Sequence, residues 1–571
     1  MTSTPNPKTY FNHDLTYESA HRATFSPPKK EIPAVLPPNL NQIDFEQAIG
    51  EFISAVGLEN VFVGEALVDY VDPYDVYEHD EGRRKVPSAA VTPSSTEELS
   101  SVLKIANKFS LPLWTFSRGK NLGYGGPAPV LSGSVALDLH RMNRILEVND
   151  TFHYAVVEPG VTWTELYEYC KSHGKKVWPS TPSLGWGSVV GNTLDRGTGF
   201  GQNFSHHQSV SGMEIMLADG SLIRTGQFGI SNSPSAHLSK FTFGPSIEGL
   251  FWQSNLGVVT KMSLWLTPQP EAFMSCSFSV NEFGDLEGLV DAFGVMRRDG
   301  TITGAVWVGN ILEGLSIYGR RNEFWAGEGA IPENRVKELQ QKHGLGYWVA
   351  KFGLYGTKRI VQAHFDDIKE RLGELVPTGT LTGHFFAADK KGELLDASSI
   401  PFEHGNVLAG VPSLMALPLV NWPLKKDGKG KPAHGDYAPI IPSSGKEILD
   451  WMRTVKPIFE ASGNDLMVDF FMHERHVIVT NMWSFDQFDE GQREAVHGLF
   501  MALHEIARER GYGMYRGHVQ HMDRIAALND FNDHAYRRLV ESIKDTVDPN
   551  GILAPGKQGI WPERYRHHRS A

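Results

Sequence analysis

A chain of 571 residues is too long for one ordinary hydrophobic core, so its length predicts two or more domains. An apolar content of 41% and a formal net charge of −12 indicate a globular protein and argue against nucleic acid as a partner. The sequence has no apolar run long enough to cross a membrane and no secretory signal at its start, so we expect no membrane partner.

Residues 1–38 are polar and rich in Pro, Ser and Thr, and we expect an extension rather than a core element. Packing against the body of the molecule or a neighbouring subunit is the alternative. Beyond the extension, Ser95 and Glu98 form a capping-box pattern before apolar residues at helical spacing. The pattern predicts strands over 111–116, 135–139 and 154–158 and a helix over 163–172. Such alternation indicates an α/β domain.

The pattern changes near Pro268. From there to about Arg510 helices and strands mix without a strong motif, and the remaining residues carry new Gly-rich and basic motifs. We interpret the middle segment as a domain inserted into the first one. The predicted parts are an N-terminal extension (1–38), a first domain (39–268), an inserted domain (269–510) and a C-terminal segment that completes the first domain (511–571).

Two glycine-rich stretches are the first chemically informative feature. Trp114–Gly126 holds four glycines within eight residues, directly after a predicted strand, and Ser183–Gly199 is the second stretch. Consecutive N–H groups in such loops can hold a pyrophosphate without a cationic side chain. Neither stretch has the Rossmann or P-loop spacing, so a Rossmann domain is not supported. Either loop alone would equally fit a turn without a ligand.

Taken together, the order and flanks of the two loops resemble the FAD domain of the vanillyl-alcohol oxidase and p-cresol methylhydroxylase family. Four further segments carry the same resemblance, which extends from about Leu36 to Trp561: 157–161, 211–220, 253–261 and 548–557. The resemblance implies an α+β fold, with an FAD-binding domain of two α/β subdomains and an inserted α/β cap domain. It also implies FAD as the cofactor, with its pyrophosphate on the first loop.

The matching positions imply a set of cofactor-binding residues. They are Ser117, Arg118, Gly119, Lys120, Asn121, Leu122, Gly123, Ser183, Leu184, Gly187, Ser188, Gly191, Asn192, Gly199, Gly257, Val258, Arg516 and Lys557. His434, in the segment Lys431–Pro439, resembles the histidine that is bonded to the flavin 8α-carbon, so a covalent FAD is expected. A cap-domain histidine beside noncovalent FAD is the alternative. Some relatives carry an assisting histidine after an Asp-Pro pair, whereas here Tyr74 follows Asp72-Pro73.

Tyr124 lies in the first loop, and Tyr515 and Arg516 lie close to the C-terminus. The resemblance implies that the three side chains surround a phenolic oxygen. A free phenol has a pKa of about 10 and is a poor electron donor while protonated. A guanidinium, which keeps its charge, lowers that pKa, and two tyrosine hydroxyls share the phenolate charge. The resemblance then implies hydride transfer from the para α-carbon to flavin N5, giving a p-quinone methide. An isolated Tyr-Arg pair would more often be a surface contact.

The residue expected to act as the catalytic base differs from the one in the alcohol-oxidising members. Those members carry an aspartate where this sequence has Ser183, and serine is no general base near neutral pH unaided. Asp469 lies on a predicted alternating strand, at a position where methylhydroxylase-type members carry a glutamate together with that serine. We expect Asp469 to activate a water that attacks the quinone methide from the opposite face. The alternative is that Asp469 points to solvent or pairs with an arginine.

The expected substrate is therefore a small para-substituted phenol: a 4-alkylphenol, a 4-hydroxybenzyl alcohol or an allylphenol. In the leading hypothesis the protein is an oxidase that passes electrons to O₂. In the second it passes them to a cytochrome c subunit. In the third the protein binds flavin as a partner of another protein and has no turnover of its own. We expect a homo-oligomer, a dimer or higher, and no metal site, because the paired histidines complete no ligand set. Two cysteines, Cys170 and Cys276, fit a reducing compartment or indifference to redox state. The expected location is cytoplasmic; a peroxisome is the alternative for a eukaryotic source, although the C-terminus carries no clear signal.

Overall fold

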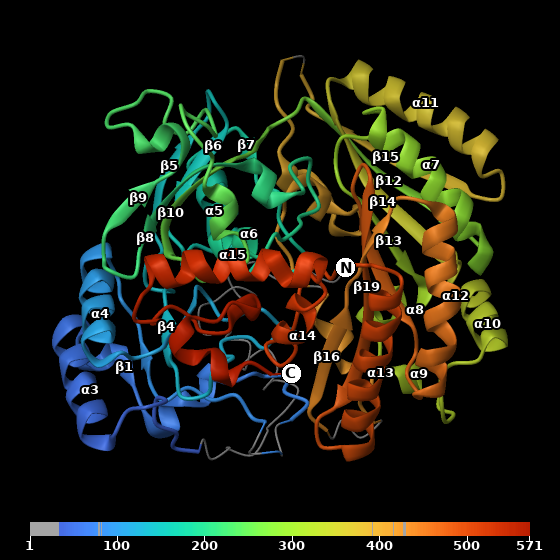
Figure 1. Cartoon of the computed structure of the whole chain (residues 1–571). Coiled ribbons are helices and arrows are strands. Elements are labelled where there is room, and N and C mark those ends of the chain that lie inside the picture. The colour runs from blue at the N-terminus through green and yellow to red at the C-terminus, as the bar shows by residue number, and fades with distance from the viewer. Residues whose placement is uncertain are drawn as a thin grey trace.

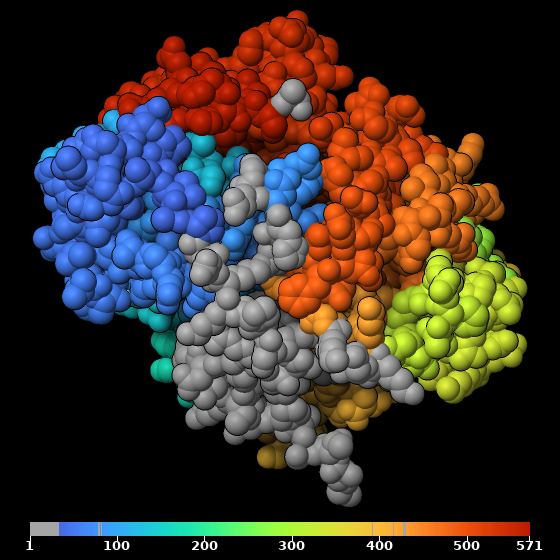
Figure 2. All heavy atoms as spheres, turned by 90° about the horizontal axis from the view of Figure 1, so that it is seen from below, coloured from blue at the N-terminus to red at the C-terminus, as the bar shows by residue number. Residues whose placement is uncertain are grey.

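The computed structural model describes residues 33–77, 80, 83–390, 392–414, 416–425 and 430–570. Most of the predicted N-terminal extension therefore lies outside the described residues. Figure 1 shows two halves side by side, one built from the N- and C-terminal parts of the chain and one from its middle. Figure 2, seen from below, shows α3 and its surroundings (blue) and the orange and yellow-green middle segments on opposite sides of that face. No described helix is long and apolar enough to cross a membrane.

The first sheet has the order β1-β2-β4-β3, and β2, β4 and β3 run parallel. Its strands are β1 (Val61–Phe62), β2 (Ala90–Val91), β3 (Leu113–Phe116) and β4 (Val135–Asp138), and it packs with α3 (Gln42–Val56) and α4 (Thr96–Phe109). Ser95 caps α4 by accepting from the Glu98 N–H, as its sequence pattern predicts. The Glu98 carboxylate, however, accepts from Ser94 N–H, so the predicted capping box is only half formed.

The second sheet is antiparallel, with the order β5-β6-β10-β8-β9. Its strands are β5 (Ile145–Asn149), β6 (Tyr154–Val157), β8 (Val210–Met216), β9 (Leu222–Arg224) and β10 (Val258–Trp265). It shares a core with α5 (Trp163–Ser172) and α6 (Val189–Leu194). Thr162 and Glu165 form a complete capping box on α5, and this helix has the predicted bounds.

The C-terminal part of the chain returns to these two sheets. Leu553 lies beside Leu113 as a parallel bridge, with main-chain bonds on both sides of it. The C-terminal helices are α14 (Met522–Ala526) and α15 (Phe531–Val547), and α15 crosses this half in Figure 1. Inside the fold, Lys544 Nζ lies 2.7 Å from Asp548 Oδ2, and neither side chain is exposed to solvent.

The middle of the chain forms one large antiparallel sheet with the order β15-β12-β14-β13-β18-β19-β16, and β17 pairs with β19. Its strands are β12 (Ala272–Val280), β13 (Val306–Asn310), β14 (Trp348–Gly356), β15 (Thr380–Ala387), β16 (Pro432–Tyr437), β17 (Ile440–Pro442), β18 (Met467–Met472) and β19 (His476–Asp486). Helices lie on its outer side in Figure 1: α7 (Leu286–Arg298), α8 (Ile311–Tyr318), α9 (Arg321–Phe324), α10 (Glu333–His343), α11 (Lys358–Leu375), α12 (Gly445–Ala461) and α13 (Glu490–Glu509). We call this sheet the cap sheet. Its inner side faces the first half of the molecule.

Candidate active site

A cavity of about 380 Å³ lies where the two glycine-rich loops, the C-terminal segment and the cap sheet meet. The walls from the first half are the loop after β3, the segment from Pro182 to Asp195 and the segment from Gln253 to Val259. The cap sheet contributes residues of three neighbouring strands. The fold therefore brings together segments more than 300 residues apart in the sequence.

Nearly all the residues predicted for the site line this cavity. They are Ser117, Arg118, Gly119, Lys120, Asn121, Leu122, Tyr124, Ser183, Leu184, Gly187, Ser188, Gly191, Asn192, Gly257, Val258, His434, Asp469, Tyr515, Arg516 and Lys557. Gly123 and Gly199 do not line it. A Cβ at Gly199 would lie 2.4 Å from the Ser180 carbonyl oxygen, so this glycine permits close packing of the second loop. A Cβ at Gly123 would lie 3.1 Å from His434 Nε2, so Gly123 lets the first loop approach that histidine.

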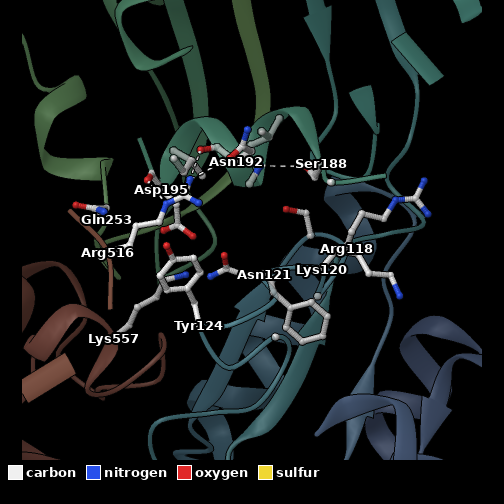
Figure 3. Close-up of a pocket in the computed structure, with 18 of the residues that line it drawn as sticks. Arg118, Lys120, Asn121, Tyr124, Ser188, Asn192, Asp195, Gln253, Arg516 and Lys557 are labelled. Atoms are coloured by element: carbon white, nitrogen blue, oxygen red, sulfur yellow. Dashed lines mark hydrogen bonds between the residues drawn. The ribbon is translucent and has the colours of Figure 1, made fainter. Parts of the chain in front are cut away.

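The first loop fits a pyrophosphate through its main chain. Within the described residues, the N–H groups of Gly119, Asn121 and Leu122 donate to no protein acceptor. Most of the Arg118 side chain is bound within the protein, because its Nε donates to the Gly160 carbonyl (2.7 Å) and its Nη2 donates to Glu165 Oε2 (2.9 Å). Figure 3 shows Arg118 turned away from Tyr124 and Arg516. Unpaired N–H groups beside a cavity form an anion-binding loop, so the loop fits the group that the sequence predicts.

The second loop packs closely on the first at Gly191. A Cβ at Gly191 would lie 2.4 Å from Ser117 Oγ. Ser188 begins α6 by accepting from the Gly191 N–H (3.0 Å), and its own hydroxyl donates to the Pro159 carbonyl (2.5 Å). Any larger residue at position 191 would therefore have to displace the Ser117 hydroxyl.

Arg516 is held in place by the C-terminal end of α6. Its Nε donates to the Asp195 carbonyl (2.9 Å), and its Nη2 donates to Asn192 Oδ1 (3.0 Å). A cation is favoured at this end of a helix. Among the described residues Nη1 makes no hydrogen bond. The arginine is therefore fixed by the protein and keeps donors for a ligand.

The two predicted tyrosines lie beside this arginine, as Figure 3 shows for Tyr124. The guanidinium carbon is 4.9 Å from the centre of the Tyr515 ring and 5.7 Å from the centre of the Tyr124 ring. The Tyr515 hydroxyl donates to the Arg196 carbonyl at 2.8 Å. Burial raises the pKa of both phenols, while Arg516 lowers it, so both remain protonated near neutral pH. We call these three residues the phenol clamp.

Asp469 faces the cavity from the cap sheet. It lies opposite Gly309 on β13 and Thr480 on β19, and its Oδ2 accepts from Trp307 Nε1 at 3.0 Å. Burial raises the pKa of Asp469 to about 6, and hydrogen bonds from Trp307 and Thr480 oppose that rise. Asp469 makes no ion pair with an arginine among the described residues. This geometry disfavours the alternative in which it points to solvent.

A second buried carboxyl lies close to Asp469. Glu313 is 4% exposed, and its Oε2 has no hydrogen-bond partner within the described part of the chain. Its Oε2 lies 2.9 Å from where a Cβ at Gly309 would be, on the strand that pairs with Asp469. Burial and the Asp469 charge raise the pKa of Glu313 to about 8, so it is neutral near pH 7.

His434 lies on β16, and the ring of Tyr74 packs edge-on against it with 4.9 Å between ring centres. Tyr74 is the residue that follows Asp72-Pro73, so the tyrosine occupies the place beside the predicted linking histidine. Asp72 Oδ2 itself accepts from His518 Nε2 at 2.7 Å. The Asp-Pro-Tyr pattern thus marks a residue that contacts His434, but the pattern does not predict what Tyr74 does there.

Sequence reasoning missed several contacts of the site. Asp195 and Gln253 belong to segments that were singled out, and Gln253 Nε2 donates to the Tyr515 carbonyl at 2.9 Å. Burial and the Asp436 charge raise the pKa of Tyr124, and this aspartate could have been found because strand alternation places it on the same face as His434. Trp307 and Glu313 carry no motif that indicates the site.

Comparison with known proteins identifies the class. Residues 87–226 match the FAD binding domain family, and residues 423–558 match the C-terminal domain of FAD linked oxidases. FAD is therefore the cofactor, and the protein is a flavin-dependent oxidoreductase. When bound, FAD would be held by the first loop, whose fit is described above, together with the second loop and Lys557, which line the same cavity.

Closer relatives identify the family. The chain is 32% identical over 537 residues to the 4-cresol dehydrogenase [hydroxylating] flavoprotein subunit of Pseudomonas putida, covering 92% of this chain and 98% of that one. The solved 4-ethylphenol oxidase from Gulosibacter chungangensis, in its isoeugenol complex, matches with a TM-score of 0.86 and 33% identity over 93% of this chain and all of that one. Substrate-bound p-cresol methylhydroxylase matches with a TM-score of 0.83 and 32% identity over 92% and 99%. The chain belongs to the vanillyl-alcohol oxidase and p-cresol methylhydroxylase family, and its predicted α+β fold is confirmed.

Proposed function

We propose that this protein oxidises para-substituted phenols, 4-alkylphenols above all, by removing hydride from the carbon attached to the ring. The observation that carries the proposal is the phenol clamp: a fixed arginine and two protonated tyrosines on a cavity whose first loop offers unpaired N–H groups to FAD. The relatives named for 4-cresol and 4-ethylphenol support the same substrate class. FAD, when bound, supplies the hydride acceptor.

The clamp raises the electron density of the ring. Because Arg516 cannot lose its charge, it favours the phenolate over the phenol. Its other donors are already bound to Asn192 and Asp195, so the guanidinium does not have to reorganise when charge develops. Loss of hydride from such a phenolate leaves a neutral p-quinone methide.

The test is anaerobic bleaching of the flavin by a panel of phenols. We expect 4-ethylphenol and 4-cresol to reduce the flavin, and the corresponding methyl ethers, which cannot ionise, to leave it oxidised. Reduction by the ethers at a similar rate would contradict a phenolate mechanism. Lack of reduction by every phenol in the panel would exclude the proposed function.

We infer that Asp469 is the base for water addition to the quinone methide. Its pKa of about 6 leaves it ionised at neutral pH, and it faces the cavity from the cap sheet, whereas Ser183 lies on the opposite, glycine-loop side. Chiral analysis of the alcohol formed from 4-ethylphenol tests this. In the double variant Ser183→Asp with Asp469→Ser, the base changes sides, so the preferred enantiomer should reverse. An unchanged enantiomer, or full hydroxylation by Asp469→Ala, would contradict the role.

We also infer that His434 carries a covalent bond to FAD. Its position on the cavity wall next to Gly123 supports this attachment. Denatured wild-type protein should retain flavin fluorescence on a gel, and His434→Ala should release all of it. Release from the wild type as well would show that the cofactor is noncovalent.

O₂ is the electron acceptor in the leading proposal, and a cytochrome c subunit is the alternative. The relative from Pseudomonas putida is named as a dehydrogenase subunit and the one from Gulosibacter chungangensis as an oxidase, so similarity supports either acceptor. Oxygen consumption by the purified chain with 4-ethylphenol decides between them. Stoichiometric H₂O₂ supports the oxidase, and turnover only with added cytochrome c supports the alternative.

A further inference from the structure

The Asp72-Pro73 pair, which stands out in the sequence, is bonded in the structure to the segment that carries the phenol clamp. Asp72 is buried, with only 6% of the residue exposed. Its Oδ1 accepts from the Tyr74 N–H at 2.9 Å, and its Oδ2 accepts from His518 Nε2 at 2.7 Å. Both oxygens of this buried carboxylate are therefore used, and one of them is bonded to a residue 446 positions further along the chain.

The His518 ring is held at both of its nitrogens. Its Nδ1 accepts from the Gln520 N–H at 3.2 Å, so the ring proton lies on Nε2, which donates to Asp72. Only 15% of the His518 side chain is exposed. A histidine with both ring nitrogens bonded keeps one tautomer and one orientation. Asp72 therefore fixes the place of the main chain that carries His518.

That main chain carries the phenol clamp. Tyr515 and Arg516 lie three and two residues before His518. The residue after it, Val519, donates its N–H to the carbonyl of Tyr124, the third clamp residue, at 3.2 Å. The bond from Asp72 thus meets the chain between Arg516 and the main-chain link to Tyr124.

The first glycine-rich loop lies directly on this segment and on the Asp-Pro pair. A Cβ at Gly125 would lie 2.5 Å from Val519 Cγ2, and a Cβ at Gly126 would lie 3.1 Å from Pro73 Cδ. The Pro73 carbonyl also accepts from Gln487 Nε2 of the cap domain at 2.9 Å. The main chain beside Asp72 is therefore held by the loop and by the cap, so the carboxylate is presented from a fixed position.

A buried carboxylate is an expensive way to hold two segments together. Removing it from water costs free energy, and apolar side chains of similar volume often stabilise a fold equally well. A hydrogen bond, unlike an apolar contact, sets a distance and a direction. The clamp needs both, because three side chains must meet one phenolic oxygen, and a misplacement of about 1 Å can slow a reaction about a hundredfold.

We propose that Asp72, acting through His518, positions the phenol clamp. Helix α6 holds the guanidinium of Arg516, and the Asp72–His518 bond holds the main chain of the same segment. Asp72 does not line the cavity, so it is a positioning residue. The inference rests on the proposed function, because it gives the clamp a phenol to bind.

The test uses the FAD-loaded protein with 4-fluorophenol, which has no α-hydrogen and cannot be oxidised in this way. Fluorine NMR reports whether the bound ligand is phenol or phenolate, and we expect the wild type to bind phenolate near neutral pH. In Asp72→Asn, Oδ1 can still accept from Tyr74, but the amide that replaces Oδ2 is a donor that meets the Nε2–H of His518. The ratio of bound phenolate to bound phenol should fall about tenfold or more, at an unchanged FAD content.

Asp75→Asn is the matched control. Asp75 is a buried carboxyl three residues away, and its Oδ1 accepts from the Tyr77 N–H at 2.8 Å. Within the described part of the chain it makes no hydrogen bond to residues 515–519. The variant removes a neighbouring negative charge but not the bond to His518, so it should leave the ionisation of the ligand at the wild-type level.

Variants at the other end of the bond separate positioning from folding. His518→Phe keeps a ring but loses both hydrogen bonds, so it should lower the ionised fraction as Asp72→Asn does, and it replaces that variant if it does not fold. His518→Gln restores a side-chain donor to Asp72 and should recover part of the ionisation that His518→Phe loses. The limiting rate of flavin reduction by 4-ethylphenol should fall and recover in parallel.

An Asp72→Asn protein that ionises 4-fluorophenol like the wild type, even if it unfolds more easily, would overturn the positioning role and leave only a structural one. Equal losses in Asp72→Asn and Asp75→Asn would overturn it too, because they would reflect only the loss of a nearby charge. A wild type that neither binds 4-fluorophenol nor is reduced by 4-ethylphenol would instead refute the proposed function, which separates the two failures.

Discussion

Removing the hydrogen bond from Trp307 to Asp469 should move the pH dependence of water addition. In Trp307→Phe an aromatic ring is kept but the Nε1–H donor, 3.0 Å from Asp469 Oδ2, is lost. A hydrogen bond to a charged group contributes about 1.5–3 kcal/mol, and one pKa unit corresponds to about 1.4 kcal/mol. The bond stabilises the ionised form, so its loss should raise the pKa of Asp469 by roughly one to two units.

The wild-type pKa of about 6 would then become roughly 7–8. A base acts only when ionised, so the acid limb of the pH profile should move to higher pH. At pH 6.5 the ionised fraction, and with it the rate, should fall roughly three- to twenty-five-fold and recover near pH 9. Stopped-flow decay of the quinone methide absorbance measures this step apart from flavin reduction.

Trp325→Phe is the matched control, because Trp325 Nε1 makes no hydrogen bond among the described residues and the side chain does not line the cavity. It should leave the profile unchanged. A Trp307→Phe profile whose acid limb stays near the wild-type position, with only a lower plateau, would refute Asp469 as the base for this step.

Three further changes test other parts of the site and fold. Glu313→Gln should leave the quinone methide decay unchanged up to about pH 7, because the pKa of about 8 keeps Glu313 neutral there; a shifted acid limb would contradict this assignment. Gly191→Ala places a Cβ 2.4 Å from Ser117 Oγ, and overpacking of about 1–3 kcal/mol should lower the FAD content per chain, measured by absorbance ratio. Lys544→Met leaves the buried Asp548 without its cation and should lower the free energy of unfolding by about 3–5 kcal/mol in denaturant titrations. Lys390→Met, at a side chain that is 83% exposed, should change it little.

Local elements of the fold could be predicted because their signals are local. Helix α5 has the predicted bounds, since its capping box and apolar spacing lie within the helix itself. The strand predicted over 111–116 begins only at Leu113, after Pro112, which has no N–H for a sheet. The order of the cap sheet could not be predicted, because antiparallel pairing joins strands such as β13 and β18 that are far apart in the sequence.

The site, like the fold, could be predicted from the sequence only in part. The family resemblance implied that Tyr124, Asp469 and Arg516 belong to one site, and in the structure all three line one cavity. It did not predict their partners, because those partners lie in other segments: Trp307 is 162 residues from Asp469. A pKa is set by such partners and by burial, so the acidity of a side chain follows only from the folded structure.

Helix α6 links the two functions of the site. Its start carries Gly191 against the first glycine-rich loop, and its end carries the Asn192 and Asp195 acceptors that fix Arg516. A shift of this short helix would therefore move the cofactor wall and the phenol clamp together. Because hydride transfer needs the ring and its acceptor in a fixed relation, one rigid element between them limits their relative movement. On the other side of the cavity, Asp469 faces it from β18 of the cap sheet. The proposed base and the phenol clamp are thus positioned by different elements, the cap sheet and helix α6.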